Sequence, residues 1–448
     1  EFNFEKLPIV EIANEIIMDA VNKGASDIHF DPSQDSLKIR FRIDGILSDY
    51  SIIPSKYKRN MISRIKMIAG MNIMETRLPQ DGAIKSKIGE RFLDLRVSSL
   101  PTNNAEKIVI RILDYSMSLA GLDNLGFSED AMEKINRLIK IPNGIILVTG
   151  ATGTGKSTTL YSILQKLNTE AVNIITVEDP VEMDIEGINQ VQTQSEIGLT
   201  FATILRSILR QDPNIIMIGE IRDDETARIA VRASITGHLV LSSLHTNNSL
   251  NTIERLTDMD VERYLLGSSL EGIISQRLAR KVCPECSIKR PTTDYERQVF
   301  KTVLGKDVLE MVVANKEGCP KCTHGYKGRL AILEVLVMNE QIKDAITNGA
   351  NKNTLRELVY TGDVVTLLQD GLNKVVLGET TFEEILKIVD LENDMTQYND
   401  DNLKTNLKMA QQAHKVDNKT NDKPITSNIT SEFKIEKTNN ENIETVEF

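Results

Sequence analysis

The residues with the clearest chemistry lie in a glycine-rich stretch, GATGTGKSTT, at positions 150–159. The stretch satisfies the pattern G-x-x-x-x-G-K-[ST], follows the apolar run GIILVT and leads into the helix-like run TLYSILQKL. Glycines let backbone N–H groups turn inward around phosphates, and the N-terminus of the following helix adds a partial positive charge. We predict that the loop binds ATP, with Lys156 on the β and γ phosphates and Ser157 on Mg²⁺. The predicted binding residues are Gly150, Ala151, Thr152, Gly153, Thr154, Gly155, Lys156, Ser157 and Thr158. The alternative is a glycine-rich turn without a ligand.

Acidic residues follow two other strand-like runs. Glu178 and Asp179 follow NIITV, and Glu220 follows NIIMIG. Ligands bind at the carboxyl ends of strands in open α/β sheets, and hydrolysis needs a carboxylate near the metal and a group that orients water. Glu220 looks like the distal acid of a Walker B element in which Gly219 replaces the usual aspartate, so Mg²⁺ would be held partly through water. For Glu178 and Glu220 the alternative is a helix N-cap or a surface acid.

Two histidines flank a third strand-like run, HLVLSSLHTNN. His238 precedes the run and His245 follows it, so the two rings should lie near opposite ends of one strand. His245, beside Thr246 and Asn247, is well placed to sense the γ phosphate. His238 fits a direct role and a structural hydrogen bond equally well.

The four cysteines form two CxxC pairs, Cys283 with Cys286 and Cys319 with Cys322. Each pair turns two thiolates towards one point, and four thiolates complete a tetrahedral zinc shell. Such a closed shell predicts a structural zinc site that staples a subdomain, with no open position for catalysis. A redox-active CxxC is the alternative, and His324 is a further candidate ligand.

The elements that must position these residues divide the chain into parts. Alternating strands with amphipathic helices predict a small α+β domain at 1–114, followed by a connector at 115–126. Apolar strands that alternate with helical runs then predict a mainly parallel α/β sheet with crossover helices. After the core at 127–282 we expect a tetracysteine subdomain at 283–330 and a helical part at 331–390. The polar composition of 391–448 predicts a disordered tail.

The composition argues against a membrane-spanning protein and against a protein that mainly binds nucleic acid. The chain has 448 residues, enough for two or three domains, and its apolar content is 40% without a run long enough to span a membrane. No secretory signal is apparent at its start, so we expect a cytoplasmic protein that reaches membranes through partners. The net charge of −11 argues against a surface built mainly for nucleic acid.

Taken together, the blocks GATGTGKSTTLYSIL, ITVEDPVE, GLTFATILRSILRQDPNIIMIGEIRDDETA and TGHLVLSSLHTNN resemble the secretion ATPase superfamily, in the branch of type IV pilus assembly and type II secretion ATPases. They are similar to that family's Walker A motif, Asp box, Walker B motif and His box. The resemblance spans residues 7–390 and implies a RecA-like core with a PAS-like α+β N-terminal domain. Members usually carry a further N-terminal domain that docks onto a membrane partner, and this chain begins after the place of that domain.

The resemblance also gives roles to arginines that pattern alone would assign to the surface. Arg77, Arg96 and Arg111 match positions at which the family's N-terminal domain presents arginines to the γ phosphate, a task that suits a guanidinium. For Arg96 and Arg111 the alternative is a solvated strand face. Arg206 and Arg210 would share a helix face that points towards the same region or a neighbouring subunit.

The leading interpretation is a hexameric motor that hydrolyses ATP, closes its N-terminal domains onto neighbouring cores, and drives an inner-membrane platform protein that extrudes pilin-like subunits. The tetracysteine site resembles the assembly and secretion branch more than the pilus retraction branch. A nucleic-acid motor on the same core is a second interpretation, although no nucleic acid is expected as a partner. A nucleotide-gated binding module with negligible turnover is the third.

Overall fold

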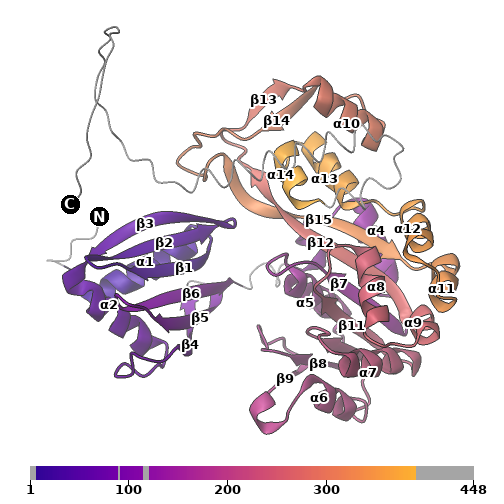
Figure 1. The fold of residues 1–448 in the computed structure, drawn as a ribbon, viewed down its shortest axis with the longest axis horizontal. Helices are drawn as coiled ribbons and strands as arrows, with labels where there is room; N and C mark the ends of the chain where they lie inside the picture. The colour runs from indigo at the N-terminus through magenta and orange to yellow at the C-terminus, as the bar shows by residue number, and fades with distance from the viewer. Residues whose placement is uncertain (1–6, 89–90, 115–120, 390–448) are drawn as a thin grey trace, which may run out of the picture.

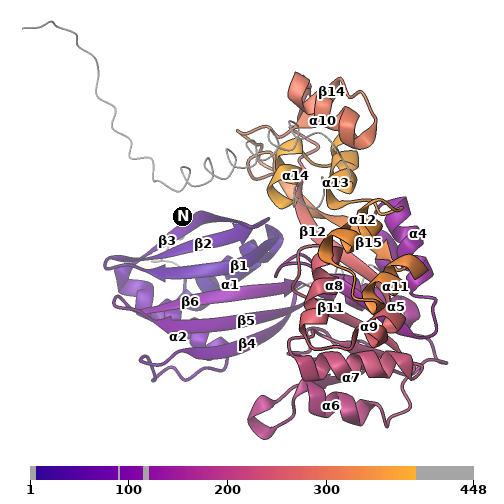
Figure 2. The same ribbon diagram turned by 45° about the vertical axis from the view of Figure 1, so that its right-hand side comes forward.

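The computed structural model describes residues 7–88, 91–114 and 121–389 (Figure 1). The described residues form a six-stranded sheet, a seven-stranded sheet and a two-stranded sheet. The predicted tail at 391–448 and connector residues 115–120 lie outside them. In both views the N-terminal domain lies to one side of the larger core (Figures 1 and 2).

The six-stranded sheet belongs to the N-terminal domain. Its strand order is β3-β2-β1-β6-β5-β4, and every neighbouring pair is antiparallel. The strands are β1 (Ala25–Pro32), β2 (Ser36–Ile43), β3 (Ile46–Pro54), β4 (Gln80–Ile88), β5 (Arg91–Pro101) and β6 (Glu106–Asp114). Helices α1 (Ile9–Asn22) and α2 (Ser55–Ile68) pack on this sheet.

The two faces of this sheet differ in chemistry because successive side chains of a strand point to opposite sides. On β1, Ile28 and Phe30 are buried in a cluster with α1 and α2. The alternate positions Asp27, His29 and Asp31 lie on the opposite face, which carries charged residues on four neighbouring strands. The N-terminal domain therefore turns a polar sheet face away from its helices.

The seven-stranded sheet forms the core, in the order β15-β12-β7-β11-β10-β8-β9. Its strands are β7 (Gly144–Thr149), β8 (Ile174–Glu178), β9 (Asn189–Gln192), β10 (Ile215–Ile218), β11 (Leu239–Leu244), β12 (Leu270–Val282) and β15 (Tyr326–Val337). All neighbouring pairs are parallel except β12 with β15. The predicted mainly parallel α/β sheet is confirmed, and the antiparallel strand at its edge was not anticipated.

Helices cover both faces of the core sheet, which explains why its central strands are apolar without alternation. Ile145 and Leu147 of β7 pack with one group of helices, whereas Ile146 and Val148 pack with the other. The first group is α6 (Phe201–Ile208), α7 (Asp224–Ile235), α8 (Ser249–Asp258), α9 (Arg263–Ser269), α11 (Glu340–Thr347) and α12 (Lys352–Tyr360). The second group is α4 (Glu129–Leu138) and α5 (Lys156–Leu167). Short 3-10 turns lie at Leu122–Asn124 and Ser195–Ile197.

A separate small unit lies beside the C-terminal end of β12 and the N-terminal end of β15. A two-stranded sheet, β13 (Ile288–Pro291) with β14 (Glu310–Val313), flanks helix α10 (Asp294–Leu304). Helices α13 (Leu367–Val376) and α14 (Phe382–Ile388) pack with α10 in one apolar cluster. Helix α10 therefore lies between the two cysteine pairs in the sequence.

Candidate nucleotide site and metal centre

The glycine-rich loop joins β7 to α5, as its sequence predicts. Helix α5 begins at Lys156, directly after the loop, and Gly155 has a φ of 87°, which disfavours other residues. A Cβ atom at Gly155 would lie 2.8 Å from Nε2 of Gln276, and one at Gly150 would lie 2.6 Å from the Gln276 carbonyl oxygen. The loop is therefore packed closely against Gln276 of β12.

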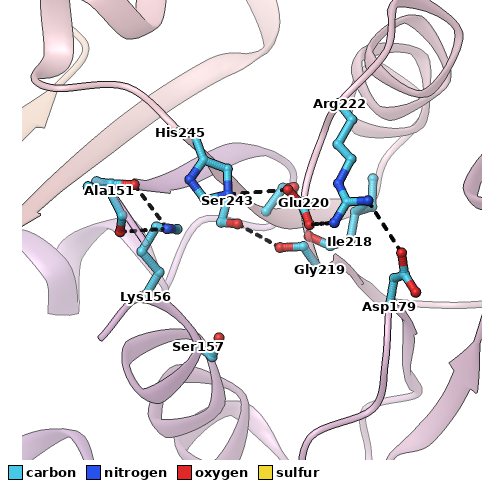
Figure 3. A network of polar contacts seen from close by, with 12 residues as sticks. Ala151, Lys156, Ser157, Asp179, Ile218, Gly219, Glu220, Arg222, Ser243 and His245 are labelled. Atoms are coloured by element: carbon cyan, nitrogen blue, oxygen red, sulfur yellow. Dashed lines mark hydrogen bonds and ion pairs between the residues drawn. The ribbon is translucent and has the colours of Figure 1, made fainter. Parts of the chain in front are cut away.

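The predicted binding residues, 150–158, form this one loop and the first turn of α5. The Lys156 ammonium donates hydrogen bonds to the carbonyl oxygens of Gly150 at 2.9 Å and Ala151 at 3.1 Å (Figure 3). Burial lowers the pKa of Lys156, while the carboxylate of Glu220 opposes that shift. A cation held at a glycine-rich loop before a helix N-terminus suits the phosphates of a nucleotide.

Gln276 on β12 anchors the loop, and no sequence pattern pointed to this residue. Its side chain is 3% exposed. Nε2 donates to the Thr154 carbonyl oxygen at 2.7 Å, and Oε1 accepts from the Thr159 hydroxyl at 2.7 Å. Since both bonds are buried, Gln276 fixes the loop to the neighbouring strand.

Glu182 is an acid that contacts the predicted magnesium ligand, Ser157. The Ser157 hydroxyl donates to Oε1 of Glu182 at 3.3 Å, and the Glu182 backbone N–H donates to the Tyr161 hydroxyl at 3.1 Å. Burial raises the pKa of Glu182, and the Ser157 hydroxyl and the charges of Arg96 and Lys156 oppose that shift. Glu182 was not among the acids predicted from the sequence, although it lies four residues after Glu178 in the same acidic segment.

Glu178 itself lies in a buried polar network beneath the loop. Its side chain is 4% exposed and accepts hydrogen bonds from Thr176 at 2.5 Å, Gln190 at 3.0 Å and the Tyr161 hydroxyl. Burial and the neighbouring carboxylate raise the pKa of Tyr161. The network occupies both Glu178 oxygens, so this acid supports the segment that carries Glu182.

Glu220 lies two residues after the end of β10 and contacts two basic groups. Nε2 of His245 is 3.3 Å from Oε2 of Glu220, and Arg222 donates to Oε1 (Figure 3). Arg222 also lies 3.4 Å from Asp179. Burial alone would raise the pKa of Glu220, but Arg222, His245 and Lys156 together lower it. The site thus holds an ionised carboxylate beside the loop.

The two histidines lie at opposite ends of β11, as predicted from their spacing. His245 follows the strand at the Glu220 end. Nδ1 of His238 is 2.8 Å from the carbonyl oxygen of Ala233, in the last turn of α7. His238 therefore serves as a hydrogen-bond partner for a helix end at the edge away from the loop.

The arginines predicted from the resemblance fall into different environments. Arg96 and Arg111 are direct partners on β5 and β6, and the Arg96 charge acts on Glu182 across the two domains. Arg77 lies before β4, pairs with Glu75 at 2.8 Å and is 85% exposed. Arg206 pairs with Glu225 on α7, and Arg210 donates to the Arg206 carbonyl oxygen at 2.8 Å. The charge of Arg96 thus lowers the pKa of a carboxyl group that contacts Ser157.

The cysteines meet at the end of the β12–β15 pair. Because Val282 pairs with Tyr326, the CxxC turn after β12 and the CxxC turn before β15 face each other. The sulfur of Cys283 is 3.8 Å from that of Cys319, and Cys286 is 3.6 Å from Cys322. A tetrahedral zinc shell with bonds of about 2.3 Å separates its sulfur atoms by about 3.8 Å, so the four thiols fit such an ion. His324 is not a member of this cluster.

Within the described ranges, none of the helices combines the length and the apolar content that crossing a bilayer requires.

The matching family model and the similar proteins point to the same family. Residues 3–387 match the model of the family described as type II/IV secretion system protein. The chain is 46% identical over 383 residues to the type II secretion system protein E of Xanthomonas campestris pv. campestris, covering 86% of this chain and 68% of that protein. It is 45% identical over 381 residues to the type IV pilus assembly ATPase PilB of Myxococcus xanthus, covering 85% and 67% respectively. A crystal structure of the pilus retraction motor PilT with bound ADP is similar with a TM-score of 0.53 and 26% identity, covering 89% of this chain and 98% of PilT.

Proposed function

Because the chain belongs to the type II/IV secretion system protein family, whose activity is ATP hydrolysis, we propose that it is a hexameric motor for assembly of a type IV pilus or a type II secretion pseudopilus. It acts in the cytoplasm on an inner-membrane platform protein, and through that protein on pilin-like subunits. The observation that carries the proposal is the convergence of Lys156, Ser157, Glu182 and Glu220 on one phosphate-binding loop.

In this proposal each group at the loop has one task. Lys156 and the loop N–H groups bind the phosphates of ATP, and residues 150–158 supply the contacts. Glu220 orients and deprotonates the attacking water, because its ionised carboxylate lies beside Lys156. His245 holds Glu220 at 3.3 Å and responds to the γ phosphate.

Mg²⁺ fits the donor set formed by Ser157 and Glu182. A hydroxyl and a carboxylate are hard oxygen ligands, which suit this ion. The ion would neutralise charge on the phosphates when it is bound. Glu182 is the acid that would reach it, since Gly219 leaves no aspartate in the usual Walker B position.

The N-terminal domain converts nucleotide binding into movement. Arg96 and Arg111 meet the γ phosphate only when the domain closes, and Arg77 joins them from its loop. ATP biases closure because contacts made in the closed state alone can shift the equilibrium. The Arg96 charge near Glu182 supports this arrangement.

The proposed domains are 1–114, a connector at 115–126, the core at 127–282, a zinc subdomain at 283–330 and a helical part at 331–390; strand β15 of the core sheet crosses the boundary at 330. Zn²⁺ held by Cys283, Cys286, Cys319 and Cys322 would staple the zinc subdomain shut, and its full shell leaves no catalytic position.

The test is an ATPase assay of the full chain with and without double-stranded DNA. The molecular mass of the protein in solution with ATP is measured in parallel. We expect Mg²⁺-dependent turnover by a hexamer that DNA does not stimulate. Strong stimulation by DNA would favour the nucleic-acid motor, and ATP binding without turnover would favour a nucleotide-gated binding module.

A further inference from the structure

We propose that Asp27 is a positioning residue for Arg111, an inference that rests on the proposed role of Arg111 at the γ phosphate. Asp27 lies on β1 at the polar face of the N-terminal sheet. It does not touch the nucleotide site. Its effect on hydrolysis would pass through the guanidinium that it holds.

The register of the sheet brings four charged residues into one row. Asp27 is the direct partner of Arg42 on β2 and of Arg111 on β6. Arg111 is in turn the direct partner of Arg96 on β5. The row therefore reads Arg42, Asp27, Arg111, Arg96 across four neighbouring strands, with one acid among three bases.

The contacts of Asp27 hold Arg111 at one end. Nε of Arg111 donates to Oδ1 of Asp27 at 3.1 Å. Oδ2 accepts from the Ser26 hydroxyl at 2.8 Å and lies 3.8 Å from Nε of Arg42. The side chain of Asp27 is 10% exposed and that of Arg111 is 62% exposed. A fixed acid thus anchors the inner end of an arginine whose outer end is in solvent.

The choice of nitrogen determines what Arg111 can still bind. A guanidinium has five N–H donors, and four of them are on the two terminal nitrogens. Because Asp27 uses Nε, the terminal pair is left for another acceptor, and no other described residue accepts from Arg111. These two nitrogens form the fork that binds phosphate oxygens in a bidentate manner.

The same device recurs on the next strand. Nε of Arg96 donates to Oδ2 of Asp94 at 3.0 Å. Like charges directly opposite each other on neighbouring strands repel, so Arg96 and Arg111 each need a counter-charge to remain side by side. Asp27 and Asp94 supply it without occupying the phosphate-binding fork.

The experiment compares Asp27→Asn, Arg111→Ala and the double variant in the full chain, with steady-state ATP hydrolysis as the readout. We expect Asp27→Asn to lower kcat by about 10- to 100-fold, since misplacement of a reacting group costs that much. The KM for ATP should stay within about twofold of wild type, because the loop at 150–158 is in the other domain. In the double variant, Asp27→Asn should add nothing to the loss caused by Arg111→Ala.

Asp31→Asn is the matched control. Asp31 lies on the same face of β1 and pairs with Arg40 at 2.6 Å and with Lys107, outside the arginine row. Its loss should leave kcat unchanged, and Asp27→Glu should restore part of the activity because it keeps the charge.

Two results would overturn the inference and leave the proposed function standing. The first is a normal kcat in Asp27→Asn when the kcat of Arg111→Ala is reduced. The second is a loss of kcat from Asp27→Asn that is equally large in wild type and in the Arg111→Ala background. Normal hydrolysis in Arg111→Ala would instead remove the proposed role of Arg111, and the positioning role with it.

Discussion

The Ser157 hydroxyl lies 3.3 Å from the carboxylate of Glu182, which places an acid beside the serine of the glycine-rich loop. This pair gives the first prediction. Glu182→Gln should raise the Mg²⁺ concentration needed for half-maximal hydrolysis, because a neutral amide is a weaker ligand for this ion. Hydrolysis measured against Mg²⁺ concentration tests it, with the exposed Glu186→Gln as control. An unchanged Mg²⁺ dependence would remove Glu182 from the metal site.

The second prediction separates binding from chemistry. Glu220→Gln should bind ATP with near-normal affinity and lose about 10²-fold or more in turnover, because its carboxylate acts on water. Lys156→Ala should lose binding and hydrolysis together, since the lysine contacts phosphates in the ground state. Nucleotide titration and steady-state rates distinguish the two. Near-normal turnover in Glu220→Gln would transfer the catalytic role to Glu178 or Glu182.

The third prediction concerns closure of the N-terminal domain. Arg96→Ala should retain ATP binding, since residues 150–158 are in the other domain, while turnover falls by about 10³-fold or more. The distance between the domains, measured with and without a non-hydrolysable ATP analogue, should change less than in wild type. Arg40→Ala, on the same sheet face but paired with Asp31, is the control. Normal turnover and closure in Arg96→Ala would leave Arg96 as part of a solvated strand face.

The fourth prediction concerns the metal centre. Purified protein should carry one Zn²⁺ per chain, and Cys286→Ser should lower that content and the stability of the zinc subdomain before it affects ATP affinity. Elemental analysis, thermal unfolding and nucleotide titration measure these three quantities. Metal-free protein with four reduced thiols would contradict the zinc site.

The fifth prediction concerns pH and the packing of α14 against β12. Nε of Arg280 donates to Glu384 at 2.8 Å, and both side chains are largely buried. Burial alone would raise the pKa of Glu384, but Arg280 and Lys387 lower it below its ordinary value. The pair therefore stabilises the fold above the ordinary pKa of about 4.3 in the unfolded chain, and this contribution is lost as pH falls through the lower folded-state pKa.

Glu384→Gln should accordingly lower the free energy of unfolding at pH 7 by about 3 kcal/mol, because it leaves Arg280 without its charge partner. The difference from wild type should shrink as the pH falls below about 4.3. Denaturant unfolding at several pH values measures it, with the neighbouring Glu383→Gln as control. A difference that is independent of pH would show that packing, and not charge, carries the contribution.

The sequence was most informative where a feature is local. The loop at 150–158 and the two CxxC pairs are short patterns whose conformation depends on their own residues, and the structure places each group as a unit. Strand and helix periodicity likewise predicted the parallel sheet, because buried strands must be apolar on both faces.

The residues that were missed depend on contacts between distant segments. Gln276 is more than a hundred residues from the loop that it anchors, and only the pairing of β12 with β7 brings them together. The spacing of Glu178 and Glu182 did not reveal which carboxylate faces Ser157, because the Tyr161 hydroxyl on α5 decides that orientation.

Strand β12 links the two candidate sites in a single run of backbone. Gln276 holds the glycine-rich loop, Arg280 holds α14, and Cys283 follows the last residue of the strand. Gln276 and Arg280 are four positions apart, so they lie on one side of the strand. A slip of one position against β7 and β15 would turn both side chains to the wrong side. The register of β12 therefore positions the residues of the nucleotide site and of the metal centre at the same time. An insertion or deletion of one residue within the strand would damage both sites together.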